Sequence, residues 1–302
     1  MQLGNSSLNV SNIALGCMRL SSLSKQEASY VIHNALDLGV DFFDHADIYG
    51  DGESESIFSE AINMTPALRE KMVIQTKTGI RKGYFDFSKA HILDSVDESL
   101  KRLKTDYIDV LLLHRPDALV EPEEVAEAFS TLKESGKVRH FGVSNHSPLQ
   151  IELLKKYVEQ DLIANQLQFS IMFTGMIDAG LNVNMQHSPA TDRDGGILDY
   201  SRLNDMTIQA WSPFHYGFFG GIFVDHPDFP TLNAKLEEIA DRYGVTKSAI
   251  AIAWIIRHPA NMQTIVGTMT PDRLRDISKA SELLITRKEW YDIYQAAGNE
   301  LP

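Results

Sequence analysis

Short apolar runs alternate along the chain with longer segments whose apolar residues recur every three or four positions. The short runs are typical of buried strands, and the longer segments have the periodicity of amphipathic helices. Ile92, Val96 and Leu100 show the helical spacing clearly. Eight runs are predicted as strands, over residues 12–18, 40–44, 72–77, 107–114, 139–144, 163–169, 206–211 and 263–267.

Helices are predicted between and after these strands, and several carry end signals. Ser88 stands at an N-cap position, and Ser147 and Pro148 open another helix at the N-cap and in the first turn. Gly39 and Gly136 follow predicted helix ends. The predicted helices span residues 25–38, 54–63, 91–103, 121–135, 197–203, 231–243, 246–257 and 286–297, with others opening at Ser147 and Thr270.

Two long segments lack a regular pattern. Residues 170–196 are predicted as an extended loop, with two methionines and Phe173 near its start. Residues 212–230 form a second predicted loop, which contains five phenylalanines, one tyrosine, three glycines and three prolines. Both segments follow predicted strands.

The alternation of strands and helices predicts an α/β fold, a (β/α)8 TIM barrel with extra helices and long loops at the C-terminal face. No linker divides the chain, so residues 1–302 are predicted as one domain. A doubly wound sheet is the second possibility, but its GxGxxG signature is absent after the first predicted strand.

Composition and charge narrow the classes of function. The chain has 302 residues, 43% of them hydrophobic and 23% charged, which is ordinary for a globular protein. Its formal net charge of −13 disfavours nucleic acid as a partner, because phosphate binding needs a basic surface. The single cysteine, Cys17, excludes an intramolecular disulfide and fits a reducing cytosol.

The chain shows no export or membrane signal. Residues 1–11 lack the basic and apolar regions of a signal peptide, and no apolar run approaches the roughly 18 residues of a membrane helix. We therefore expect a cytoplasmic protein that binds neither membrane nor nucleic acid. No coiled coil or added interaction domain is visible, so no obligate protein partner is expected.

Three predicted strands each end on an ionisable residue. These residues are Asp44, Lys77 and His114, and Tyr49 follows Asp44 by five positions. In a parallel barrel, strand ends and the loops after them form the active face. Each residue alone would more commonly be a cap, a packing residue or a solvated loop residue. Their coincidence at strand ends is what predicts a site.

These four residue types suit proton transfer to a carbonyl oxygen. The ordinary pKa of tyrosine is about 10, and a nearby ammonium such as Lys77 would lower it. Asp44 would keep the lysine charged, and His114 would orient the carbonyl group. The set contains no nucleophile and no evident metal-ligand trio, so hydride from a cofactor is the expected attacking group. His45 is expected to pack or to support the site from behind.

The chain resembles the aldo-keto reductase family over nearly its whole length. The family's Asp-Tyr-Lys-His tetrad matches Asp44, Tyr49, Lys77 and His114, in the segments FFDHADIYG, QTKTG and LLLHRPD. Further family motifs follow in order, namely FGVSNH, NQLQFS, AWSPF and VGTMTPDRLRD. The resemblance implies an NADPH-dependent reductase of aldehydes or ketones, with Tyr49 as the general acid.

The resemblance also implies a nicotinamide dinucleotide that lies extended across the barrel mouth, without a Rossmann domain. Trp211 would stack on the nicotinamide, and Ser144, Asn145 and Gln166 would bind its carboxamide. Taken alone, Asn145 and Gln166 fit ordinary turn or strand-end hydrogen bonds equally well. The full set of implied cofactor-binding residues is Gly16, Cys17, Met18, Asp44, Ser144, Asn145, Gln166, Trp211, Ser212, Pro213, Phe214, Gly267, Thr268, Arg273 and Asp276.

The expected site for the cofactor's 2′-phosphate departs from the family pattern. Many members carry a lysine where this chain has Gly267, whereas Thr268 and Arg273 remain in suitable positions. A forked guanidinium pairs well with phosphate, so NADP(H) is predicted over NAD(H). Asp276 is expected to reach the adenine side. The alternative for Arg273 is a surface ion pair on its own helix.

The substrate pocket is predicted from residues in the loops that follow the strands. The expected substrate-binding residues are Ile48, Tyr49, His114, Tyr84, Phe85, Phe173 and Tyr216, with Phe214, Phe218 and Phe219 as further candidates. Such an aromatic lining predicts a small-molecule carbonyl substrate, namely a hydrophobic aldehyde or ketone. The alternative for the aromatic-rich loop is that it packs against the extra helices. A second function stays open, a nucleotide-binding barrel that acts as a redox sensor or partner-binding subunit with little turnover.

Overall fold

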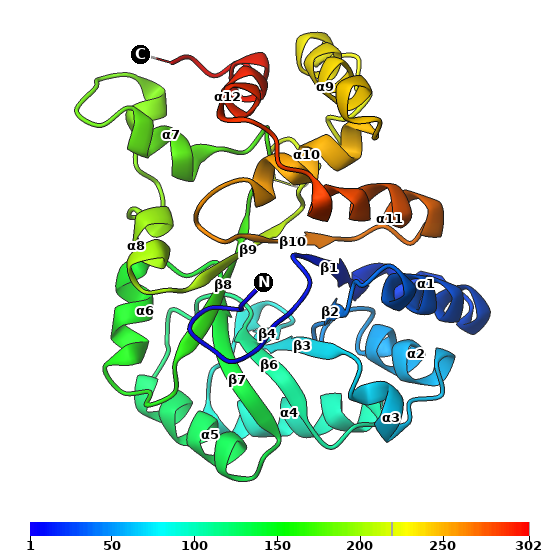
Figure 1. Ribbon diagram of the computed structural model, residues 1–302. Helices are drawn as coiled ribbons and strands as arrows, with labels where there is room; N and C mark the ends of the chain where they lie inside the picture. The colour runs from blue at the N-terminus through cyan, green and yellow to red at the C-terminus, as the bar shows by residue number, and fades with distance from the viewer. Residues whose placement is uncertain (219, 302) are drawn as a thin grey trace.

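The computed structural model describes residues 1–218 and 220–301. Eight parallel strands close into a barrel in the order β1, β10, β9, β8, β7, β6, β3, β2 (Figure 1). The predicted (β/α)8 barrel is confirmed. Its strands are β1 (Ile13–Gly16), β2 (Phe42–Asp44), β3 (Val73–Thr78), β6 (Ile108–Leu113), β7 (Val138–Ser144), β8 (Leu162–Gln168), β9 (Thr207–Trp211) and β10 (Gln263–Val266).

Helices cover the outside of the barrel (Figure 1). Ser88 is the N-cap of α4, as predicted, and its side chain accepts a hydrogen bond from the His91 backbone at 3.3 Å. The longer helices are α1 (Lys25–Asp37), α2 (Glu53–Ala61), α4 (Lys89–Leu103), α5 (Pro122–Glu134), α6 (Pro148–Lys155), α8 (Ile197–Leu203), α9 (Pro230–Tyr243), α10 (Lys247–Ile256), α11 (Pro271–Ser278) and α12 (Arg287–Ala296). Short elements are α3 (Pro66–Arg69), the strands β4 (Ile80–Arg81) and β5 (Tyr84–Phe85), and the 3-10 turns η1 (Cys17–Ser22), η2 (Ser188–Ala190) and η3 (Lys279–Glu282).

The segment 170–196, predicted as a loop, contains helix α7 (Gly175–Leu181). This helix has seven residues and includes two glycines, so its sequence shows no helical period. Contacts from distant parts of the chain hold it in place. Tyr294 Oη of α12 donates a hydrogen bond to Asp178 Oδ1 at 2.6 Å, and Ile177 is buried.

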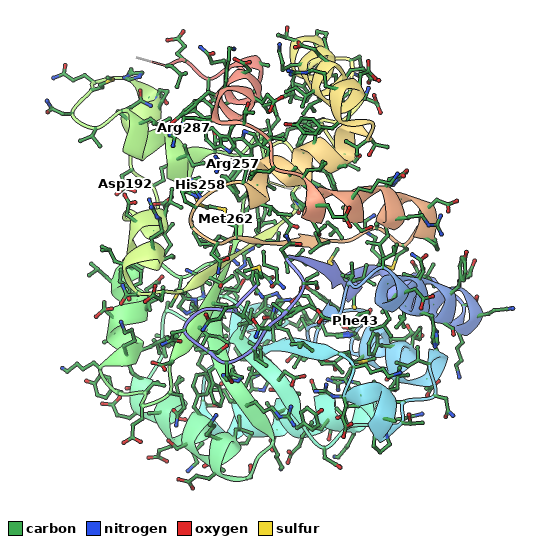
Figure 2. The ribbon with its side chains drawn as sticks, viewed as in Figure 1. Phe43, Asp192, Arg257, His258, Met262 and Arg287 are labelled. Carbon is green, nitrogen blue, oxygen red and sulfur yellow. The ribbon has the colours of Figure 1, made fainter. Side chains whose placement is uncertain are left out.

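Apolar side chains fill the layer between the barrel and its helices. Phe43 of β2 lies between the barrel wall and α1 and α2, with its ring 5.1 Å from that of Phe58 (Figure 2). Helix α10 is apolar on all sides and is buried from Ala249 to Ile255, because it packs among β10, α9 and α11. Within residues 1–218 and 220–301, no helix is long and apolar enough to cross a membrane.

The N-terminal residues close the bottom of the barrel. Gln2 and Asn9 form an antiparallel bridge, and this hairpin crosses the barrel end that faces the viewer in Figure 1. Leu3 and Val10 pack against interior side chains of the strands, including Phe42. The hairpin therefore excludes water at this end and leaves the C-terminal end of the barrel as the open one.

Gly4 lets the hairpin approach the barrel wall. It has a φ of +56°, and a Cβ built there would lie 2.3 Å from the Ile163 carbonyl oxygen. Its backbone nitrogen also donates to Thr207 Oγ1 at 2.7 Å. A side chain at this position would meet backbone atoms, which cannot move aside.

We expect Gly4→Ala to lower the free energy of unfolding by more than Gly39→Ala. Gly39 has a similar φ of +74° but open space around it, so its variant measures only the left-handed backbone cost of about 1–2 kcal/mol. Gly4→Ala adds overpacking, typically a further ~1–3 kcal/mol. Urea unfolding measures both, and equal losses in the two variants would contradict a tight hairpin contact.

Candidate active site

The C-terminal ends of the barrel strands surround a cavity of about 540 Å³. Most residues predicted for the site contribute to its walls. Those that line it are Gly16, Met18, Asp44, Ile48, Tyr49, His114, Ser144, Asn145, Gln166, Trp211, Ser212, Pro213, Phe214, Gly267, Thr268 and Arg273.

Lys77 lies at the centre of a buried group of hydrogen bonds. Its Nζ donates to Asp44 Oδ2 at 2.8 Å, to the His45 carbonyl oxygen at 2.8 Å and to Tyr49 Oη at 3.1 Å. The side chain of Lys77 is 0% exposed and that of Asp44 is 3% exposed. Lys77 is not part of the cavity wall, so its charge reaches the cavity through Tyr49.

The pKa values of this group follow from burial and from the ion pair. Burial is the largest single effect and acts to lower the pKa of Lys77, but Asp44 and Tyr49 together outweigh it and raise the pKa above its ordinary value. Burial is also the main cause that raises the pKa of Tyr49, and the Lys77 ammonium offsets only part of that effect. Lys77 does act to lower the pKa of Tyr49, as expected, but burial outweighs this effect and the pKa stands above its ordinary value. The phenol stays protonated at neutral pH.

His114 faces Tyr49 across the cavity. The ring centroids are 6.1 Å apart and the planes are nearly perpendicular. Burial, together with the Lys77 and Arg115 charges, lowers the pKa of His114 well below its ordinary value, so the imidazole is neutral at pH 7. Its buried Nδ1 has no hydrogen-bond partner within the described part of the chain. A neutral imidazole retains one N–H donor.

Four buried glutamines fill the barrel interior beside and below Asp44. Gln75 Nε2 donates to Asp44 Oδ1 at 2.6 Å and to Gln209 Oε1 at 3.0 Å. Gln166 Nε2 also donates to Asp44 Oδ1, at 3.0 Å, and Gln209 Nε2 donates to Gln263 Oε1 at 2.8 Å. Only Gln166 was predicted as a site residue. The missed signal is a glutamine inside each of four strand runs, where barrels usually carry branched apolar residues.

Four predicted cofactor-binding residues on β7, β8 and β9 are joined by hydrogen bonds. Asn145 Nδ2 donates to Ser144 Oγ at 2.8 Å, and Asn145 Oδ1 accepts from Trp211 Nε1 at 3.2 Å. Ser144 Oγ donates to the Gln166 carbonyl oxygen at 3.0 Å. These bonds fix the side chains along one edge of the cavity. His45, which follows β2 on another side of the barrel, packs edge-on against the Phe58 ring of α2, with the ring centroids 4.6 Å apart.

Two arginines line the part of the cavity near β1 and β10, and β10 is the neighbour of β9, which ends at Trp211. Gly267 carries no side chain, and a Cβ built there would lie 3.7 Å from Arg19 Nη2. Arg19 and Arg273 both line the cavity. Neither arginine forms an ion pair with any residue in 1–218 or 220–301, so the surface ion pair considered for Arg273 is not found there. Cationic groups therefore flank the position where the family pattern has a lysine.

Several predicted residues lie outside the cavity wall. Cys17 is fully buried, and its thiol donates to the Leu15 carbonyl oxygen at 3.5 Å, so this residue offers no atom to the cavity. Asp276 pairs with Lys279 on the next turn, at 3.2 Å. This ion pair on the outer surface explains why the Asp276 carboxylate does not reach the cavity.

Four predicted substrate-binding residues also lie away from the wall. Tyr84 and Phe85 form strand β5 of a small hairpin and are 56% and 42% exposed. Phe173 is exposed in the turn before α7. Tyr216 packs against the Phe229 ring at 5.0 Å. Each of these aromatic residues follows a strand in sequence, but the loop that carries it turns outward.

The aromatic loop after β9 contributes fewer rings to the cavity than expected. Phe214 lines the cavity. Phe218 is exposed and lies edge-on to Trp211, with centroids 6.3 Å apart. Phe219 lies outside the described residues.

The cavity wall also contains residues that were not predicted. Arg19 and Arg115 directly follow the predicted Met18 and His114, so adjacency was the signal that could have identified them. The unpredicted lining residues are Arg19, Ile80, Arg115, His215, Ile222, Val224, Asp225, Ser248 and Ile265. Among the described residues, no cluster of three or more histidine, cysteine or acidic side chains has the arrangement of a metal site.

The arrangement can donate a proton to an oxygen in the cavity. Tyr49 supplies the proton, and the adjacent ammonium of Lys77 stabilises the phenolate that remains. His114 offers a second donor to the same oxygen. The geometry therefore suits a carbonyl group that gains negative charge on its oxygen.

Comparisons with known proteins agree with this geometry. The protein-family model described as "Aldo/keto reductase family" matches residues 12–297 of this chain. The oxidoreductase YcsN of Bacillus subtilis (strain 168) is 35% identical over 311 residues, which cover 98% of this chain and 97% of that protein. A 6-dehydroglucose reductase of Novosphingobium aromaticivorans is 34% identical over 314 residues, which cover 100% of this chain and 96% of that protein.

Solved structures give the same fold. The thermostable aldo-keto reductase Tm1743, determined in complex with the inhibitor epalrestat, matches with a TM-score of 0.80. The match covers 98% of each chain at 24% sequence identity. At this identity the likeness shows the fold alone.

Removing the charge of Asp44 would leave the Lys77 ammonium buried without a counter-ion. We expect Asp44→Asn to lower the free energy of unfolding by about 3–5 kcal/mol, the usual cost of breaking a buried ion pair from one side. Asp44→Asn/Lys77→Met removes both charges and should be more stable than the single variant. Urea unfolding followed by circular dichroism measures all three proteins.

The exposed pair between Lys101 and Glu98 gives a matched control. Glu98→Gln should change the free energy of unfolding by less than about 1 kcal/mol. If Asp44→Asn were as stable as the wild type, the charged state assigned to the buried pair would be wrong.

Proposed function

Because the chain belongs to the aldo/keto reductase family and is an NAD(P)H-dependent oxidoreductase acting on carbonyl groups, we propose that it reduces an aldehyde or ketone to an alcohol with NADPH and uses Tyr49 as the general acid. One observation carries the proposal. The buried chain from Asp44 through Lys77 to Tyr49 ends at the cavity, where neutral His114 faces the phenol.

The residues around the cavity fit a nicotinamide dinucleotide. Asn145 and Gln166 supply amide groups at one edge, and Trp211 supplies a flat ring beside them. Arg19 and Arg273 supply cations in the part of the wall near β1 and β10. A reduced nicotinamide, when bound, supplies hydride to the carbonyl carbon of the substrate.

Within the protein, Tyr49 donates its phenolic proton to the carbonyl oxygen. The raised pKa of Tyr49 ensures that this proton is present at neutral pH. Lys77 Nζ, 3.1 Å from the phenol oxygen, then stabilises the phenolate, and Asp44 holds the ammonium in place. The N–H of His114 binds the carbonyl oxygen from the other side. Solvent returns a proton to Tyr49 after the alcohol leaves.

Preference for NADPH is the finer part of the proposal. Gly267 provides no cation, but Arg19 comes within 3.7 Å of a Cβ built at that position and Arg273 lines the same cavity, and neither has a carboxylate partner among the described residues. A guanidinium can bind a phosphate through two parallel hydrogen bonds. We assign most of the discrimination between NADPH and NADH to Arg273, with help from the Thr268 hydroxyl.

The substrate is proposed to be a small carbonyl compound. The name of the Novosphingobium relative describes reduction of a sugar aldehyde, so sugar aldehydes belong in a test panel. A redox sensor or partner-binding subunit with little turnover is the alternative. The continuous hydrogen-bond chain to Tyr49 favours an enzyme, because a nucleotide sensor has no need for a proton donor in its cavity.

We expect Tyr49→Phe to lower the turnover of aldehydes by at least about 10²-fold, as loss of a general acid usually does. Cofactor binding should stay close to that of the wild type, since Lys77 is the one hydrogen-bond partner of the phenol hydroxyl among residues 1–218 and 220–301. Spectrophotometric oxidation of NADPH and fluorescence titration of the cofactor measure the two effects.

Tyr30→Phe is the control, because Tyr30 is exposed on α1, remote from the cavity wall. Full activity in Tyr49→Phe would show that Tyr49 is not the general acid. A wild-type protein that oxidised NADPH with no aldehyde, ketone or dicarbonyl in a broad panel would contradict the enzymatic function itself.

We expect Arg273→Ala to weaken NADPH binding by about 10- to 150-fold, the factor that corresponds to a charge-assisted hydrogen bond of roughly 1.5–3 kcal/mol. NADH binding should hardly change, because NADH lacks the 2′-phosphate. Dissociation constants from fluorescence titration measure the difference. Arg275→Ala, which removes the same charge from the same helix outside the cavity, should leave the NADPH-to-NADH ratio unchanged. If Arg273→Ala weakened the binding of both cofactors equally, the assignment of Arg273 to the 2′-phosphate would be wrong.

A further inference from the structure

Arg115 is a partly buried cation in the cavity wall that the proposed reaction does not use. It follows His114 at the end of β6 and lines the cavity. Burial lowers the pKa of Arg115, but a guanidinium remains charged at neutral pH. Within the described residues, its side chain forms no ion pair and no hydrogen bond. Its donors are therefore available to a ligand.

Two aromatic rings hold this guanidinium in position. The Arg115 Cζ lies 5.8 Å from the centroid of the Trp211 ring and 6.0 Å from that of Phe218. Cation–π contacts of this kind orient a guanidinium and lower its mobility. They do not neutralise its charge or occupy its N–H groups. The Arg115 guanidinium is thus held at the cavity wall with its charge and its N–H groups available to an anion.

The carboxylates in the cavity wall already have cationic partners. Asp44 is paired with Lys77 inside the barrel. Asp225 forms an ion pair with Lys247. Neither acid is bonded to Arg115, so the anion that complements Arg115 must come with a ligand.

The position of Arg115 separates it from the proposed phosphate site. In the closed order of eight strands, β6 stands diametrically opposite β10. Arg19 and Arg273 line the cavity beside Gly267, which follows β10. Arg115 approaches from the opposite wall, next to His114. It is therefore placed at the substrate end of the cavity.

We propose that Arg115 binds a carboxylate on the carbonyl substrate, so that the enzyme prefers anionic aldehydes or ketones to neutral ones. This inference rests on the proposed reductase function. The planar fork of a guanidinium matches a carboxylate through two parallel N–H bonds. Since His114 and Arg115 are consecutive, the end of one strand holds the substrate at two points, the carbonyl oxygen and the carboxylate.

The test compares each of ortho-, meta- and para-formylbenzoate with its own methyl ester. The ester keeps the aldehyde and the ring but removes the negative charge. For each pair, the acid-to-ester ratio of kcat/KM is measured with NADPH in the wild type and in Arg115→Met. We expect this ratio to be about 10- to 150-fold higher in the wild type for at least one isomer, the effect of one charge-assisted hydrogen-bonded contact. Comparing the two ratios cancels the intrinsic reactivity of the two aldehydes.

Two further variants separate a specific contact from a general effect of charge. Arg115→Lys keeps the charge but loses the fork, so its ratio should lie between those of the wild type and Arg115→Met. Arg81→Met removes one positive charge from β4, outside the cavity wall, and should keep the wild-type ratio.

Each result has a distinct meaning. If Arg115→Met slows acids and esters equally, or leaves the ratio unchanged for all three isomers, the carboxylate assignment is overturned. Turnover of the esters by the wild type would then still support the reductase function. If the wild type oxidises NADPH with none of the six aldehydes and with no compound of the broad panel above, both the reductase function and this inference are contradicted.

Discussion

The buried charge of Lys77 is the constraint to which the interior of this barrel is fitted. An ammonium without partners costs several kcal/mol in a protein interior, so Asp44 lies beside it as a counter-ion. The second oxygen of Asp44 then needs its own donors, which Gln75 provides together with a second glutamine. The hydrogen bonds continue to Gln263, which donates to the Ser11 carbonyl oxygen at 2.8 Å near the closed end. One buried charge thus imposes a polar column on a barrel that would otherwise be apolar.

This column also explains why the two ends of the barrel differ. At the bottom, Leu3 and Val10 cover an apolar layer and exclude water, which keeps the local dielectric low and the ion pair strong. At the top, the same ion pair ends on Tyr49, at the cavity. Although the protein carries a formal net charge of −13, the cavity wall holds arginines that have no carboxylate partner among the described residues, and such cations favour anionic ligands at its mouth.

Much of this architecture is visible in the sequence because strand ends are local features. The apolar runs that end on Asp44, Lys77 and His114 predicted both the barrel and the convergence of these residues. The short helix α7 depends on a contact with distant Tyr294, so no local pattern revealed it. Tyr84 lies in a hairpin of two-residue strands, which are too short to show a period. The raised pKa of Tyr49 was missed for a related reason, since its direction depends on how far burial outweighs one neighbouring ammonium.

The environment of Gly267 shows where motif comparison stops being sufficient. Along the chain, glycine in place of lysine is simply the loss of a cation. In the closed barrel, however, β1 pairs with β10, and the turn that follows β1 brings Arg19 to within 3.7 Å of a Cβ built at Gly267. A positive charge therefore stands beside that position although it comes from a residue about 250 positions away in sequence. At the end of a strand in a closed barrel, the nearby charges come from residues on that strand and on the strand beside it. The cofactor preference of such a site therefore has to be derived from both strands together.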